Sequence, residues 1–248
     1  MPQFLQVSAI LFFSSVIQGT VGFASGLFAI PLLLMAGMGL PESVMINLMA
    51  SLVQSTTGAY QLRRKIDPRR TIRPIVIRLL TMPIGIYAME RTESWRQSQV
   101  TQIIGIVLLA TVLLQWAWRV KPRARLHWGW DYLAFSTSGF MAGFCGMGGP
   151  PMVLWVMAHN WPMNRARALL YFLFVTGMPP QAFIMWLMFG NKILGAMLLG
   201  LAALPALLAG LYLGLWFSRL MSDRVLRRLS WVMLVLIALS AIVMPYVT

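Results

Sequence analysis

Acidic residues, histidine and cysteine are scarce in this 248-residue sequence. It contains 6 Asp and Glu, 2 His and 1 Cys, against 20 Lys and Arg, and charged residues make up 10% of the chain. All six acids lie at the ends of apolar segments, so a carboxylate relay at a membrane midplane lacks its residues. The single Cys145 excludes an intramolecular disulfide, and metal-ligand spacing of His, Cys and Glu is absent. We expect no metal and no cofactor.

Motifs of ATP hydrolysis and of nucleophilic catalysis are also missing. The sequence has no G-x-x-x-x-G-K-[ST] loop. Cys145, the nucleophile on offer inside an apolar run, has no histidine nearby, which leaves it without the base that activates a catalytic cysteine. We therefore expect no catalytic residue, and an intramembrane enzyme is the weaker alternative.

Apolar residues, by contrast, are abundant. They make up 59% of the chain and form stretches of roughly 16–28 residues, enough to cross about 30 Å of hydrocarbon. The sequence predicts an all-α polytopic membrane protein, with 1–248 as a single domain in the cell membrane (the bacterial inner membrane). The net charge of +14 does not indicate nucleic-acid binding, because the arginines lie in short segments at helix ends. The expected segments are 3–39, 42–62, 74–89, 97–118, 129–158, 163–189, 192–217 and 225–246.

A glycine-rich break interrupts an apolar run in each half of the chain. Residues 19–31 read G-T-V-G-F-A-S-G-L-F-A-I-P, and residues 143–151 read G-F-C-G-M-G-G-P-P. Matching the two breaks gives repeat one at 1–118, a basic cytoplasmic linker at 119–128 and repeat two at 129–248. Paired broken helices near the bilayer midplane are how many secondary transporters build their substrate sites.

The distribution of basic residues favours re-entrant breaks. If each broken segment enters and leaves on one face, 17 of the 20 Lys and Arg lie together, and Arg91, Arg96 and Lys192 lie opposite. The positive-inside rule makes the face with 17 cytoplasmic. Each repeat then has a re-entrant broken-helix hairpin plus three transmembrane helices. Because three is odd, the two repeats are predicted to be inverted.

At the breaks the chain resembles the sulfite exporter TauE/SafE family of membrane transporters. Repeat two carries that family's glycine pattern followed by proline, and repeat one keeps three of the glycines. The matching residues are Gly143, Gly146, Gly148, Gly149, Pro150 and Pro151 in repeat two, and Gly19, Gly22 and Gly26 in repeat one. The resemblance implies transport of sulfite, sulfonates or other small organic anions.

The two breaks supply the predicted substrate site. A half-helix that begins after each break directs free N–H groups and the positive end of its dipole at the centre, and such helix starts bind anions. Polar side chains of neighbouring helices face the bundle interior, where they equally serve as interhelical glue. The predicted substrate-binding residues are Gly22, Phe23, Ala24, Ser25, Gly26, Asn47, Gln54, Gly146, Met147, Gly148, Gly149, Thr176 and Gln181.

Arg78 is the one basic residue clearly inside an apolar helix. Snorkelling to the cytoplasmic interface is the favoured interpretation, and an anion-attracting vestibule is the alternative. For the whole chain we expect a secondary-type transporter of small anions with alternating access, and a passive anion channel is the other alternative. The expected partners are the lipid bilayer and a small anionic substrate; no nucleic acid is expected, and a homodimer is left open.

Overall fold

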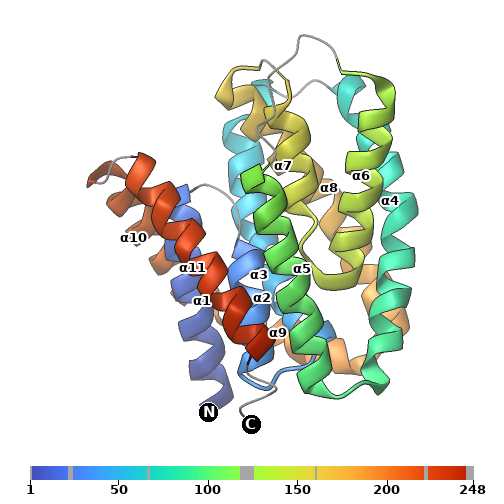
Figure 1. The fold of residues 1–248 in the computed structure, drawn as a ribbon, viewed down its shortest axis with the longest axis vertical. Coiled ribbons are helices and arrows are strands. Elements are labelled where there is room, and N and C mark those ends of the chain that lie inside the picture. Colours follow the sequence, from blue (N-terminus) through green and yellow to red (C-terminus); the bar gives the residue numbers. More distant parts are fainter. Residues whose placement is uncertain are drawn as a thin grey trace.

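The fold is known from a computed structural model that describes residues 2–21, 25–65, 68–117, 126–159, 161–220 and 223–243. These residues form α-helices joined by short turns (Figure 1). The helices are α1 (Pro2–Val21), α2 (Ser25–Met35), α3 (Leu40–Gln61), α4 (Pro68–Arg91), α5 (Gln97–Ala117), α6 (Trp128–Cys145), α7 (Gly149–Met157), α8 (Met163–Phe189), α9 (Asn191–Ala202), α10 (Leu204–Leu220) and α11 (Asp223–Val243), with short 3-10 turns η1 (Arg63–Lys65) and η2 (Thr92–Ser94).

Several of these helices are long and apolar enough to cross a membrane. Three stretches meet that test in the described ranges, Thr71–Ser94, Gln97–Leu114 and Arg165–Phe189, and the bent pair α9–α10 makes a fourth. Large apolar side chains such as Leu80 and Leu187 are exposed on these helices, as expected for a surface in contact with lipid. The prediction of an all-α fold with several membrane-spanning helices is therefore confirmed for the described residues.

One expected helix is divided in two. The sequence predicts a continuous helix over 192–217, whereas α9 ends at Ala202 and α10 begins at Leu204, with a bend of 48° between them. Pro205 explains the division, because proline lacks an N–H and its ring clashes with the carbonyl four residues earlier. It lies in the first turn of α10, where that missing donor costs nothing.

Each glycine-rich break joins two helices that fold back on each other. α1 packs against α2, and α6 against α7. In Figure 1 the open end of the α1–α2 hairpin lies at the bottom, and that of α6–α7 lies at the top. α2 has 11 residues and α7 has 9, so at 1.5 Å per residue they measure about 16 Å and 14 Å, too short to cross about 30 Å of hydrocarbon. Neither half-helix is therefore long enough to cross a membrane by itself.

One ion pair and one contact between a turn and a helix identify the two ends of the bundle. At the lower end in Figure 1, Lys192 Nζ lies 3.2 Å from Glu93 Oε1, so the turn η2 and the start of α9 lie together. At the upper end, the basic turn η1 packs against α8. The described segments thus place Arg63–Lys65 and Arg165 at one end, and Arg96 and Lys192 at the other.

Glycines bring the first helix of each half into backbone contact with a helix of the other half. α1 packs along α10, and α6 packs along α4. A Cβ atom at Gly143 of α6 would overlap the Met82 carbonyl oxygen of α4, and one at Gly214 of α10 would overlap that of Val16 in α1. Such close approach of backbones is typical of small residues between membrane helices. These crossings fix the position of both breaks.

Candidate functional site

A cavity of about 90 Å³ lies where the two breaks meet. It is lined by the start of α2, by α3, α4 and α8, and by the α6–α7 turn. Among the described residues that line it there is no Asp or Glu. The polar side chains of the lining belong to Gln18, Ser25, Asn47, Ser51, Ser55, Arg78, Arg167, Tyr171 and Gln181.

The second break is shaped by three glycines with different tasks. Gly146 has a left-handed φ of 67° and ends α6, with its N–H bonded to the Ala142 carbonyl; glycine adopts this conformation without the strain of a side chain. Gly148 precedes α7, and its carbonyl accepts a hydrogen bond of 2.6 Å from the Ser138 hydroxyl. A Cβ at Gly148 would lie only 2.6 Å from the Ser138 carbonyl oxygen. Gly149 begins α7 beside the cavity.

The first break lies directly against the second. Gly26 is so placed that a Cβ on it would lie 3.0 Å from Asn47 Nδ2 and 3.3 Å from the Gly146 carbonyl oxygen. Ser25 starts α2, and its Oγ lies 3.2 Å from Ser51 Oγ of α3. The structure thus brings Ser25, Gly26, Asn47, Gly146, Met147, Gly148, Gly149 and Gln181 of the predicted site to one cavity. Gly22, Phe23 and Ala24 lie outside the described residues.

Two of the predicted residues lie away from the cavity. Gln54 points to α1 and donates a hydrogen bond of 3.3 Å to Ser15 Oγ. Thr176 donates to the Phe172 carbonyl of its own helix at 2.8 Å, the usual bond of a membrane threonine. Gln181, in contrast, reaches the second break and donates to the Ala142 carbonyl at 2.6 Å. A shift of one residue along a helix turns the side chain by about 100°. Gln54 and Thr176 therefore face away from the cavity, although other residues of α3 and α8 line it.

Arg78 points inward, which differs from the favoured expectation of snorkelling. Its side chain is only 3% exposed and lines the cavity. One guanidinium nitrogen donates to the Leu173 carbonyl of α8 at 2.5 Å, and the guanidinium carbon lies 5.6 Å from the centre of the Phe174 ring. Gly177 leaves the space, because a Cβ there would lie 2.7 Å from the same nitrogen. The Leu173 carbonyl oxygen and the space beside Gly177, both on α8, thus hold the guanidinium within the bundle.

Sequence reasoning missed several residues that share one face of α8. Arg167, Tyr171 and Phe174 line the cavity together with Met178 and Gln181, at spacings of three and four, which place side chains on one helical face. Gln181 alone was predicted from this face. Extending its face back along α8 by helical periodicity would have found the others. Arg167 is exposed near the start of α8, and Figure 1 shows that α8 begins at the upper end of the bundle. Because Arg167 lines the cavity, the lining extends to this basic end.

The charge around the cavity is positive. The first N–H groups of α2 and α7 have no partner within their helices, and each helix start carries about half a positive charge. In α7 the second and third residues are Pro150 and Pro151, which have no N–H, so the donors at this end are concentrated at Gly148 and Gly149. Arg78 adds a full charge. These groups suit a small anion.

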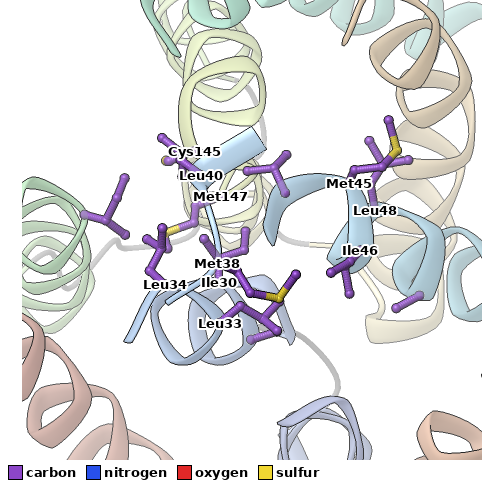
Figure 2. Packing of buried hydrophobic residues seen from close by; sticks show 14 of the residues in the cluster. Ile30, Leu33, Leu34, Met38, Leu40, Met45, Ile46, Leu48, Cys145 and Met147 are labelled. Atoms are coloured by element: carbon purple, nitrogen blue, oxygen red, sulfur yellow. The ribbon is translucent and has the colours of Figure 1, made fainter. Parts of the chain in front are cut away.

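Apolar side chains close the opposite side of the breaks. Figure 2 shows Cys145 and Met147 of the second break beside Leu34, Met38 and Leu40, near the end of α2 and the start of α3. All five side chains are buried in the same hydrophobic cluster. The cavity is therefore separated from the lower end of the bundle by packed side chains. Over the described ranges, no group of three or more His, Cys, Asp or Glu could hold a metal ion.

One family model matches almost the whole chain. The family is described as "Sulfite exporter TauE/SafE", and its model matches residues 7–241. The match includes both breaks, every lining residue of the cavity and both helix crossings formed by glycines. No curated protein and no solved structure matches the chain.

Proposed function

Because the chain belongs to the sulfite exporter TauE/SafE family, we propose that it carries sulfite or a related small sulfur oxyanion through the cavity between its two breaks. Membership makes the chain a membrane transporter of sulfite or related anions, and the family is not one of enzymes. The substrate binds in this cavity and crosses the membrane by alternating access.

The single observation that carries the proposal is the composition of the cavity. Two half-helix starts and Arg78 converge on it, and its described lining contains no acidic side chain. Its volume of about 90 Å³ is several times the 10–15 Å³ that holds one water, but far below the roughly 300–1,000 Å³ of pockets for drug-sized ligands. An anion of a few heavy atoms fits these limits, and a large organic anion does not.

We propose that the two halves are inverted repeats. The opposite directions of the α1–α2 and α6–α7 hairpins in Figure 1 support this, as do the matching crossings of α1 with α10 and α6 with α4. In this arrangement the end with Arg63–Lys65 and Arg165 is cytoplasmic, in the cell membrane. The cavity then opens to the cytoplasm, and rocking of one repeat against the other would expose it to the other face.

The apolar closure favours a transporter over a passive channel. An open channel offers a continuous path from face to face, whereas Met147 of the second break packs with Leu34 near the end of α2 (Figure 2). A protein with one open and one closed side must rearrange for each substrate, and its flux then saturates. Saturation of the flux with substrate concentration therefore distinguishes a transporter from a passive channel.

Flux measurements in proteoliposomes test the proposal. Purified protein should give saturable uptake of sulfite, and sulfite inside the vesicles should accelerate that uptake by exchange. A conductance that rises linearly with sulfite concentration would indicate a channel instead. Absence of flux for sulfite, thiosulfate and sulfonates alike would overturn the assignment of the substrate class.

A further inference from the structure

We propose that Arg78 binds the transported anion directly, as its positively charged ligand within the membrane. This inference rests on the proposed function, because it names the residue that recognises the substrate in the same cavity. It concerns a side chain for which the sequence favoured a different position, at the membrane interface.

Arg78 lies inside the helical bundle and lines the cavity. It lies in α4, within the stretch Thr71–Ser94 that is apolar enough to span a membrane, and it lines the cavity together with Ser25, Asn47 and Gly148. An arginine at such depth is rare and marks a functional site by default. Its guanidinium therefore shares one cavity with the starts of the two half-helices.

The guanidinium of Arg78 is only partly hydrogen-bonded. The Leu173 carbonyl accepts one N–H, and this neutral partner together with Phe174 and Gly177 fixes the orientation of the group. Within the described part of the chain, Nε is buried and has no hydrogen-bond partner. The guanidinium is therefore held in place by one hydrogen bond, and its Nε–H donor has no acceptor.

Arg78 has no acidic side chain beside it in the described lining of the cavity. A buried charge is costly unless it is paired and fully hydrogen-bonded. No Asp or Glu is among the described residues that line the cavity. An anion that enters the cavity would pair with the guanidinium and remove this cost.

The chemistry of the group selects the ligand. The planar fork of a guanidinium matches two oxygen atoms on one centre, as in carboxylates and other oxyanions. With about half a charge from each of two helix starts, Arg78 brings the positive charge in the buried part of the cavity to about two. Arg167 also lines the cavity but is exposed to solvent, which screens its charge. The buried charge balances a doubly charged oxyanion such as sulfite, so the site does not need a co-transported cation for charge balance.

Calorimetric titration of the purified full-length protein with sodium sulfite tests the proposal. Arg78→Gln should weaken sulfite binding at least about tenfold, since hydrogen bonds to charged groups are lost. Arg78→Lys should give an intermediate loss, because it keeps the charge without the fork. Arg73→Gln is the matched control: Arg73 is exposed on the same helix and does not line the cavity, so its dissociation constant should equal that of the wild type.

Melting temperatures separate binding from a structural role. Without sulfite, Arg78→Gln should melt at the same temperature as the wild type or higher, because it removes an unpaired buried charge. Sulfite should no longer raise its melting temperature. A lower melting temperature without sulfite, combined with unchanged sulfite binding, would show that Arg78 only supports the fold and would overturn the proposal.

Gly177→Ala decides the matter if Arg78→Gln does not fold. Its added methyl would displace the guanidinium while the charge stays, so sulfite affinity should fall several-fold. Wild-type affinity in both Arg78→Lys and Gly177→Ala would refute the role of Arg78 and leave the proposed function intact. If the wild-type protein and Arg73→Gln themselves bind no sulfur oxyanion, the proposed function fails with it.

Discussion

The hydroxyl oxygens of Ser25 and Ser51 lie 3.2 Å apart and join the start of α2 to the middle of α3. Both residues line the cavity. One hydroxyl donates to the other, and the acceptor keeps its own O–H for a further partner. The pair therefore holds a half-helix start in place and still offers a donor to an anion.

Replacement of Ser51 by alanine should weaken sulfite binding without loss of folding. The loss of one neutral hydrogen bond amounts to about 0.5–1.5 kcal/mol, or roughly two- to tenfold in affinity. The Michaelis constant for sulfite uptake should rise by a similar factor. Thr56→Ala is the control, because the Thr56 hydroxyl is exposed and bonds the Leu52 carbonyl of its own helix. An equal loss in both variants would contradict a role for the serine pair.

Gly148 should tolerate no side chain. A Cβ there would meet the Ser138 carbonyl oxygen at 2.6 Å and the Ala142 Cβ at 2.7 Å, so the turn before α7 would have to move. Gly148→Leu should abolish uptake while the protein still reaches the membrane, and Gly148→Ala should reduce uptake strongly. Gly195→Ala serves as the control, since a Cβ at Gly195 meets nothing within 4 Å. Wild-type uptake by Gly148→Leu would show that the second break does not form part of the substrate site.

Much of the helical framework follows from the sequence, because long apolar runs and clustered arginines leave few choices. The expected segments 42–62, 97–118 and 163–189 lie within a few residues of α3, α5 and α8. The division at Pro205 could not be predicted, since Pro83 lies within a continuous α4. Whether a proline bends or breaks a membrane helix depends on how neighbouring groups satisfy the freed carbonyl.

The site was predictable where it depends on the backbone and less so where it depends on contacts between helices. Glycine clusters indicate the breaks directly, and the cavity lies beside Ser25, Gly26, Gly148 and Gly149. The inward position of Arg78 depends on Leu173 and Gly177, nearly a hundred positions away, which no local pattern reveals. The repeat boundaries and the location in the cell membrane stay predictions, and a homodimer stays an open alternative.

Labelling from the two sides of the membrane should reproduce the inverted arrangement. On a Cys145→Ser background, single cysteines at Arg64 and Arg165 should react from the cytoplasm, and those at Arg96 and Lys192 from outside. The structure places the first two at one end of the bundle and the last two at the other. Labelling of positions 64 and 165 from opposite sides would exclude the hairpin arrangement.

Competition experiments should show selectivity for small anions. The cavity of about 90 Å³ combines two helix starts with Arg78 and has no acidic residue in its described lining, so its potential is positive and cations are repelled. Methanesulfonate and other small monoanions should compete with sulfite, more weakly than a second sulfur dianion does. In Arg78→Gln the charge in the buried part of the cavity falls to about one, so the difference in affinity between dianions and monoanions should become smaller. Amines and divalent metal ions should not compete in either protein. Inhibition of sulfite uptake by a polyamine at low concentration, with sulfonates inactive, would show that the positive potential does not govern binding.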